Sequence, residues 1–392
     1  MKILTTERIP VKMWIEEVEK GAMDQIRNLA NFPFAFSHIV ILPDCHQGFG
    51  MPIGAVLSTE KVIVPNAVGV DIGCGMTAVR TSLHDMTREV LKSMMSEIRK
   101  RIPLGFKHHK IAQDPSLMPE PDTSQFKVHE WPVLSSEYKN ALHQLGTLGG
   151  GNHFIEIQEG SDGFIWFMVH SGSRNIGKQV ADHYNRLAVQ LNKKWNIQGT
   201  ADRQLAFLYM DSDEGMKYRT EMNYCIEFAF SSRRLMLDRI MAVCSDLVKD
   251  AVSYSKPINI AHNFASEETH RDRTVMVHRK GATQAFKDQL GIIPGSQGTQ
   301  SYIVKGKGNP ESFNSCSHGA GRVLGRRQAQ RQLNFEKEKA FLEKKNILHS
   351  IFHKNDLDEA PGAYKNIKTV MSQQSDLVEI VIELHPLAVI KG

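Results

Sequence analysis

The sequence has few cysteines and no long apolar stretch. Its five cysteines are widely separated, at Cys45, Cys74, Cys225, Cys244 and Cys316. An odd number of scattered cysteines makes a poor disulfide framework and favours reduced thiols. No apolar run approaches the ~20 residues of a membrane span, and the first residues lack the apolar core of a signal peptide. We therefore expect a cytoplasmic protein without membrane association.

The sequence also lacks a strong charge of either sign. It contains 48 Lys and Arg against 43 Asp and Glu, which gives a formal net charge of +5. This mild excess is compatible with a phosphate-rich partner but does not require one. Hydrophobic residues make up 41% of the chain, which argues against global disorder and allows a substantial core.

No internal repeat, low-complexity tract or clear linker divides the chain. Its 392 residues would suffice for one large domain or for two to three ordinary ones. Strand-like and helix-like segments alternate irregularly, with glycine-rich loops at nearly every strand end. We therefore expect a single compact α+β domain over residues 1–392, with mixed β-sheets flanked by helices.

Three segments have the apolar periodicity of helices, over residues 87–102, 175–195 and 214–247. In the third segment, Arg233, Arg234 and Arg239 lie on the polar side, and we expect the pair Arg233–Arg234 to be solvated. Residues 106–132 are rich in Pro, Asp and Ser, which predicts a long surface loop.

Strands are expected in several parts of the chain. Up to about Arg80, short apolar runs alternate with glycine-rich loops, which predicts short strands and loops. Further strands are expected over residues 163–170, 257–262 and 273–281. The final residues, LVEIVIELHPLAVIKG, predict two short strands separated by Pro386.

Six stretches combine glycine with side chains that can bind metals or react with phosphates. They are DCHQGFGMPIG (44–54), VGVDIGCGM (68–76), GTLGGGNHFIE (146–156), VHSGSRNIG (169–177), INIAHNFA (258–265) and NSCSHGAGR (314–322). In the last of them, His318 stands among serine, cysteine and glycine. Such small neighbours would let a bulky ligand reach the imidazole ring.

Asp71 and Cys74 are three residues apart, in DIGCG. The glycines allow a tight turn that could direct both side chains to one point. Imidazoles from His153, His170 and His262 would complete a mixed set of ligands. This set suits Mn, Zn, Co or Ni better than calcium, and a thiolate that bridges two metals would create a clamp for transferring phosphates.

Taken singly, these residues have ordinary structural interpretations. A lone histidine is more often a hydrogen-bonded or surface group than a ligand. Cys74 alone is more typical of a small buried hydrophobe, and the GGG run at 149–151 of a turn. The joint occurrence of six such stretches is what favours a metal and phosphate site.

Several of these stretches, in the same order, resemble the RtcB family of GTP-dependent RNA ligases. The similar motifs are DIGCGM, LGGGNHFIE, HSGSR and SHGAGR, joined by HRKGAT, IPGSQGTQSY, PGAYKNI and the terminal VIKG. The resemblance therefore extends over nearly the whole chain. It implies an RtcB-like fold and a reaction that uses GTP and manganese.

The resemblance implies that His318 attacks the α-phosphate of GTP and becomes guanylylated. Asp44 would fix the tautomer of the ring, because the attacking nitrogen must be unprotonated. Asn152, Arg174 and Arg322 would contact phosphate, and guanidinium groups match phosphate oxygens well.

The resemblance also implies two Mn²⁺ ions. Asp71 and His153 would hold one ion, His170 and His262 the other, and Cys74 would bridge them. Both ions would neutralise the triphosphate.

Guanine selection, by the same resemblance, falls to Glu156, Ser301, Tyr364 and Lys391. The carboxylate would accept from guanine N1 and N2, the lysine would donate to O6, and the tyrosine ring would stack on the base.

The RNA chemistry follows from the same resemblance. A 2′,3′-cyclic phosphate would be opened to a 3′-phosphate, which would take GMP from His318 before the 5′-hydroxyl of a second strand attacks. The chain resembles a short, divergent bacterial branch, with Gly325 where serine is usual, and a release-factor-like protein is a further expected partner. The natural substrate stays open between tRNA halves and damaged RNA, with repair slightly favoured.

Two other functions remain open at this point. A metal-dependent phosphodiesterase or nuclease would need the metal ligands but not His318. A non-catalytic RNA-binding factor would need neither, although all six stretches keep their ligand-type residues.

Overall fold

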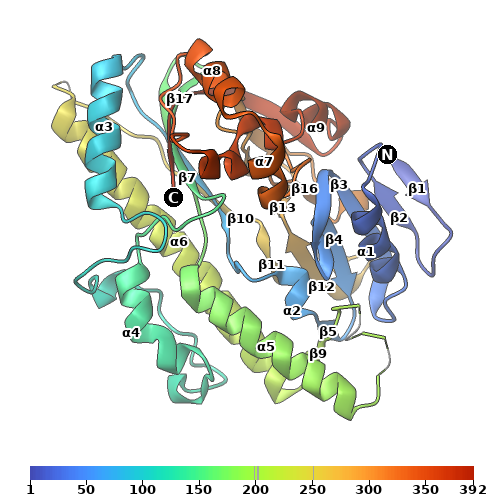
Figure 1. Ribbon diagram of the computed structural model, residues 1–392. Helices are drawn as coiled ribbons and strands as arrows, with labels where there is room; N and C mark the ends of the chain where they lie inside the picture. The colour runs from blue at the N-terminus through green and yellow to red at the C-terminus, as the bar shows by residue number, and fades with distance from the viewer. Residues whose placement is uncertain (198, 201–202, 250) are drawn as a thin grey trace.

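Two β-sheets form the framework of the protein (Figure 1). The computed structural model describes residues 1–197, 199–200, 203–249 and 251–392. The six-stranded sheet has the order β1 (Lys2–Leu4), β2 (Val11–Met13), β3 (Ala35–Phe49), β4 (Met51–Thr59), β12 (Arg273–Lys280) and β11 (Asn263–His270). It is mixed, because β2 and β3 run parallel while its other pairs are antiparallel.

The second sheet carries most of the residues of interest. Its seven strands have the order β10 (Ile258–Ala261), β6 (Gly75–Arg80), β8 (Ile165–Ser171), β7 (Phe154–Gly160), β17 (Val378–Lys391), β15 (Ser301–Gly306) and β14 (Leu290–Ile293). The pairs within the sheet that involve β6, β7 and β8 are antiparallel. Two small sheets are β13 (Ala282–Gln284) with β16 (Ser315–Ser317) and β5 (Val62–Ile63) with β9 (Leu208–Tyr209).

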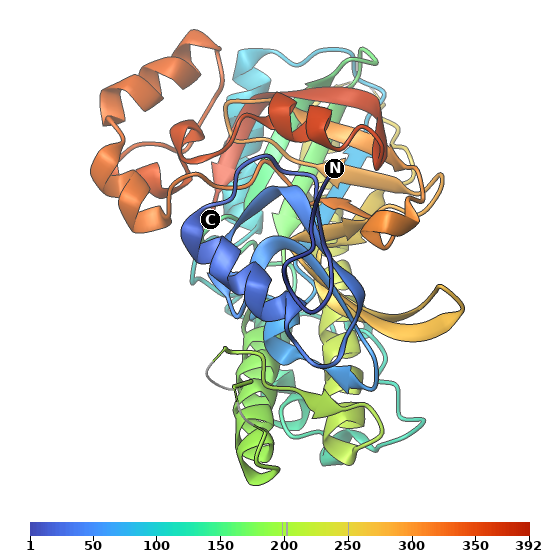
Figure 2. The ribbon, with the colours of Figure 1, turned by 90° about the vertical axis from the view of Figure 1, so that its right-hand side faces the viewer.

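Helices cover these sheets from several sides. They are α1 (Lys20–Ala30), α2 (Pro65–Val68), α3 (Arg88–Arg101), α4 (Leu134–Gln144), α5 (Arg174–Lys194), α6 (Asp213–Leu247), α7 (Arg326–Gln332), α8 (Phe335–Lys344) and α9 (Ile367–Gln373). The long helix α6 packs on β8, β6 and β10 and also contacts α3 and α5. Figure 2 shows α5 and α6 side by side, extending to one end of the molecule.

The three predicted helices are confirmed, and side-chain capping explains where two of them begin. Thr87 caps α3 by accepting from the Val90 amide, and Ser212 caps α6 by accepting from the Gly215 amide. The α+β organisation is likewise confirmed, in one compact fold with several sheets. Among the described residues, no helix combines the length and apolar character that crossing a membrane would require.

Two predictions about secondary structure are wrong. Helix α1 lies in the region predicted to hold only strands and loops, and it buries Ala22, Ile26 and Leu29 at helical spacing. The C-terminal segment forms one strand, β17, rather than two. The ladder continues past Pro386 because the register shifts between Pro386 and Ala388, a bulge that accommodates the missing N–H.

The prediction that Arg233 and Arg234 of α6 are both solvated is wrong for Arg233. Arg233 is fully buried, and its guanidinium donates to the carbonyls of Gly73 and Ser171 and to the side chain of Asn259. Arg234 does face solvent, in an ion pair with Asp238. Arg233 therefore ties α6 to the end of the sheet where the ligand-type residues lie, so its burial is compensated by hydrogen bonds.

Candidate active site

The register of the seven-stranded sheet brings the ligand-type residues together. Ala261 pairs with Gly75, Gly75 with Ser171, and His170 with Phe154 across the neighbouring strands β10, β6, β8 and β7. Each candidate ligand occupies or directly adjoins one of these paired positions: Cys74, His153, His170 and His262. Residues that are 79, 92 and 96 positions apart in the sequence therefore meet in one row at a single sheet end.

The fifth predicted ligand, Asp71, joins this row through His153, so all five predicted metal ligands lie together. The Cys74 Sγ lies 3.5 Å from the His153 Nε2 and 3.3 Å from the His170 Nε2. The His153 Nε2 is 3.0 Å from the Asp71 Oδ2, and the His170 Nε2 is 3.4 Å from the His262 Nε2. Cys74 thus stands between an Asp71–His153 pair and a His170–His262 pair.

The imidazole orientations suit metal binding through Nε2. The Nδ1 of His153 lies 3.0 Å from the Leu148 carbonyl, and the Nδ1 of His170 lies 3.1 Å from the Asn152 carbonyl. A carbonyl accepts from Nδ1–H, so the His170 Nε2 keeps its lone pair for a cation. The His153 Nδ1 also faces the Arg174 guanidinium, which can only donate, so only His170 has its tautomer fixed in this way. The Nδ1 of His262 is buried and has no protein partner among the described residues.

The electrostatics of the cluster also fit a divalent cation. Burial, together with the charge of Asp71, raises the pKa of the Cys74 thiol well above its usual value. Burial lowers the pKa of His170 and of His262, so both imidazoles are neutral. A thiolate at this position therefore needs a cation beside it, and a mixed S, N and O donor set suits a transition metal.

His318 lies beside this cluster, directly after β16. Its ring centroid is 4.8 Å from that of His262. Asp44, on β3, is fully buried, and its Oδ2 accepts from the His318 Nδ1 at 2.6 Å and from the His318 amide at 3.1 Å. Burial alone would raise the pKa of Asp44, but the charge and hydrogen bond of His318 lower it. The ring is therefore held by an ionised carboxylate at Nδ1, with Nε2 directed elsewhere.

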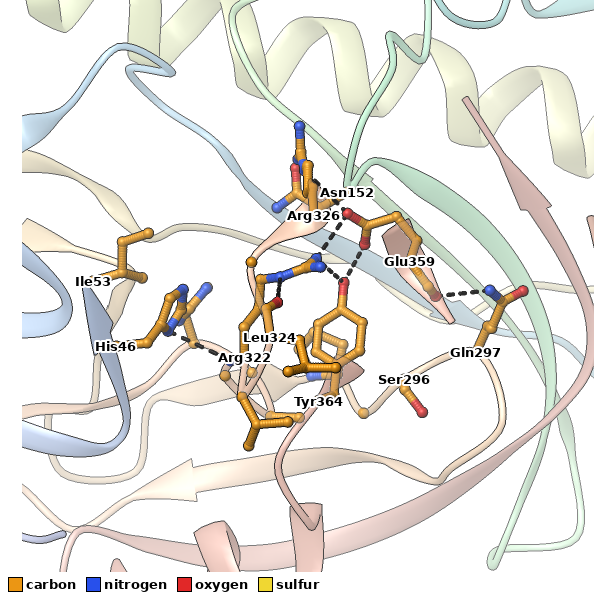
Figure 3. A pocket seen from close by; sticks show the side chains of 18 of the residues that line it. His46, Ile53, Asn152, Ser296, Gln297, Arg322, Leu324, Arg326, Glu359 and Tyr364 are labelled. Carbon is orange, nitrogen blue, oxygen red and sulfur yellow. Dashed lines mark hydrogen bonds and ion pairs between the residues drawn. The ribbon is translucent and has the colours of Figure 1, made fainter. Parts of the chain in front are cut away.

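A cavity of about 560 Å³ opens in front of His318. Figure 3 shows part of its wall, with Asn152, Arg322 and Tyr364 among the labelled residues. Its lining also includes Glu156, His170 and Lys391. The volume suits a ligand of nucleotide size, since pockets for such molecules measure about 300–1,000 Å³.

Glu156 lies in this wall, and Ser301 is joined to it through Gln158. Burial raises the pKa of Glu156 to about 8, although the charge of Lys391 and a hydrogen bond from Gln158 oppose the shift. The Gln158 amide donates to the Glu156 Oε2 at 2.6 Å and to the Ser301 Oγ at 3.3 Å. Ser301 is not part of the cavity lining, so it lies behind Glu156 rather than against a ligand.

The two predicted phosphate-contacting arginines differ in placement. Arg174 lies behind the cluster, with its Nη1 2.9 Å from the His153 Nδ1, and it does not line the cavity. A Cβ at Gly149, where φ is +85°, would overlap the Arg174 guanidinium. Arg322 does line the cavity, but its donors already engage the Leu324 carbonyl and the Glu359 carboxylate.

Several cavity residues were missed by the sequence analysis, among them His46, Arg326 and Glu359. His46 is held through Nδ1 by the Asp44 carbonyl. Glu359 contacts both Arg322 and Arg326, as the dashed lines in Figure 3 mark. His46 lies within one of the six glycine-containing stretches, whereas Glu359 carried no signal beyond its position two residues before PGAYKNI.

The sequence is similar to known proteins along nearly its whole length. The family model described as tRNA-splicing ligase RtcB matches residues 25–392. The chain is 36% identical to the RNA-splicing ligase RtcB of Escherichia coli K12, over 100% of this chain and 99% of that protein. It is 32% identical to the tRNA-splicing ligase RtcB of Methanococcus maripaludis and 29% identical to that of Thermococcus kodakarensis, in both cases over 98% of this chain and 95% of the relative.

Proposed function

The chain belongs to the RtcB family, and from that membership we propose that it is an RNA ligase. It joins RNA ends bearing a 2′,3′-cyclic phosphate or 3′-phosphate to ends bearing a 5′-hydroxyl. The reaction passes through guanylylated His318 and an RNA 3′-end activated with GMP. The observation that carries the proposal is His318 itself, oriented by buried Asp44 between the ligand cluster and the cavity.

His318 is the nucleophile of the proposed reaction. With Nδ1–H donating to Asp44, the lone pair on Nε2 is available for attack on a phosphorus atom. The Nε2–P bond forms as the bond from phosphorus to the leaving pyrophosphate breaks. Positive charge develops on the ring, and the Asp44 carboxylate stabilises it.

Asp71, Cys74, His153, His170 and His262 would hold the metal ions, which we propose are two Mn²⁺. Bound ions would neutralise the negative charge of the triphosphate. Asn152, whose carbonyl already orients His170, contributes its side chain to the cavity wall near the phosphates. Arg174 acts from behind, through His153.

Guanine is read by three residues of the cavity lining, Glu156, Tyr364 and Lys391. Glu156 accepts from N1 and N2 of the base, Lys391 donates to O6, and the Tyr364 ring stacks on the base. Ser301 supports Glu156 through Gln158, and Arg322 holds the segment that carries Tyr364. RNA, GTP and a release-factor-like protein are the proposed partners, and the cytoplasm is the proposed location.

Labelling with GTP tests the proposal directly. The protein is incubated with Mn²⁺ and GTP labelled at the α-phosphate, and a covalent label that is acid-labile and base-stable is expected, as for a phosphoramidate. His318→Ala should abolish the label while the metal content stays nearly constant. His385→Ala, which removes an exposed imidazole on β17, is the matched control.

Two outcomes would contradict the proposal. Undiminished labelling of the His318→Ala variant would show that another residue is the nucleophile. Cleavage of RNA without any labelled protein would favour a metal-dependent phosphodiesterase instead.

A further inference from the structure

Glu359 is a buried carboxylate in the wall of the cavity, and nothing in the proposed reaction yet uses it. It ends the short 3₁₀ helix Lys354–Glu359 and is 4% exposed. Carboxylates are seldom this buried unless they are paired. The groups around Glu359 therefore indicate its role.

Four side chains converge on this one carboxylate. The Oε1 of Glu359 lies 2.9 Å from the Arg322 Nη1 and 3.3 Å from the Arg326 Nε. Its Oε2 lies 3.6 Å from the Lys391 Nζ and accepts from the Tyr364 hydroxyl. Figure 3 shows Arg322, Arg326 and Tyr364 turned towards Glu359.

These partners come from separate parts of the chain. Arg322 follows β16, Arg326 begins α7, Tyr364 precedes α9, and Lys391 ends β17. All four line the same cavity. A single buried carboxylate thus joins the groups that the proposed function assigns to nucleotide binding.

The charges explain why one carboxylate can order so many groups. Burial alone would raise the pKa of Glu359, but the charges of Lys391 and Arg322 and the Tyr364 hydroxyl lower it. Without that negative charge, three cations would repel one another in a largely desolvated wall. Long Lys and Arg side chains would also regain rotamer freedom that ligand binding must then remove.

We propose that Glu359 is a positioning residue that holds Lys391, Tyr364 and Arg322 in the arrangement that receives the guanine nucleotide. It acts through these groups and does not touch the reacting atoms. This inference rests on the proposed function, because it concerns the same cavity and the same ligand.

The test compares Glu359→Gln with the parent and with Asp358→Asn. Glutamine keeps the size of the side chain and removes its charge. Asp358→Asn removes the neighbouring charge, which acts on the same cations at longer range but forms no ion pair with them among the described residues. It therefore controls for a general change of local charge. Equilibrium binding of GTP in the presence of Mn²⁺ is measured by calorimetry in a His318→Ala background, where no covalent step follows.

Glu359→Gln should weaken GTP binding about tenfold, as expected for loss of charge-assisted contacts, while Asp358→Asn stays close to the parent. It should also narrow the preference for GTP over ATP. In the protein with His318 intact, the labelling rate at saturating GTP should stay within about threefold of the parent, because positioning the base changes binding more than chemistry. GTP affinity and base preference equal to those of the parent would overturn the inference.

A second variant covers the case in which Glu359→Gln does not fold, as judged by its thermal melt. Tyr364→Phe keeps the aromatic ring and removes only the hydroxyl that binds Glu359. It should weaken GTP binding about threefold, the effect of one lost hydrogen bond, and unchanged binding would count against positioning through Glu359. If the parent neither binds GTP nor becomes labelled, the proposed function fails instead.

Discussion

The Asp44–His318 pair permits a sharp prediction for Asp44→Asn. The carboxylate oxygen that binds the ring also accepts from the His318 amide, at 3.1 Å, so asparagine can keep both hydrogen bonds through its carbonyl oxygen. The negative charge is removed, and the amide nitrogen takes the place of the Oδ1, which has no hydrogen-bond partner among the described residues. The substitution therefore tests charge stabilisation of the ring without displacing it.

The magnitude follows from the kind of contact that is lost. A hydrogen bond to a charged group contributes about 1.5–3 kcal/mol, which corresponds to roughly 10- to 150-fold in a rate constant. Asp44 is fully buried and does not line the cavity, so GTP binding should change little. We expect guanylylation at saturating GTP to slow by about that factor, with half-saturating GTP within about threefold of the parent.

The assay is the single-turnover rate of protein labelling against GTP concentration. Asp182→Asn, which removes the carboxylate of a surface ion pair on α5, is the control for an Asp-to-Asn change elsewhere. A thermal melt checks that the variant is folded. A labelling rate equal to that of the parent would refute the charge argument, and a large rise in half-saturating GTP would place Asp44 in binding instead.

Three further predictions concern the metals, the base and pH. Cys74→Ala should lower both the labelling of the protein and its manganese content, measured by elemental analysis. Cys225→Ala should mainly lower the free energy of unfolding, by on the order of 1 kcal/mol. Equally small effects of both substitutions would indicate that Cys74 has only a structural role. Lys391→Ala should raise the half-saturating GTP concentration about 10- to 100-fold, because a charge-assisted hydrogen bond is lost, and should reduce the preference for GTP over ATP. An unchanged preference for GTP, with an unchanged thermal melt, would show that Lys391 does not recognise the base. The pKa of Glu156 in the folded protein is raised from 4.5 to about 8. Glu156 therefore lowers the free energy of unfolding progressively as the pH rises from about 4.5 to about 8, because only the unfolded chain readily loses the proton. Glu156→Gln should therefore gain stability relative to the parent over that window in urea denaturation, and parallel pH profiles would contradict the shift.

Local sequence patterns predicted much of the secondary structure. The periodic apolar residues of α3, α5 and α6 give the extents of these helices to within a residue or two, because local spacing decides them, helped in α3 and α6 by a side-chain cap. The apolar residues of α1 also recur at helical spacing, but the segment is short. At Pro386, β17 continues as one strand because of a bulge, and a bulge depends on the neighbouring strand rather than on the local sequence.

The candidate site shows the same division. Motifs predicted which residues would come together at the site, since thiol, imidazole and carboxylate groups beside glycine are readable from the sequence. They also suggested the partner of His318, which the structure places 2.6 Å away at Asp44. The chemical identity of these residues can be read from the sequence without a structure.

Tertiary structure alone decided how those residues are arranged. The register of four strands sets the row of ligands, because each position depends on pairing with a distant strand. The same long-range packing buries Arg233, sets Ser301 behind Glu156, and gathers three cations around Glu359. Residues with no local signal acquire a role only when chain segments far apart in sequence enclose them in a low-dielectric wall, where one buried charge can order several others.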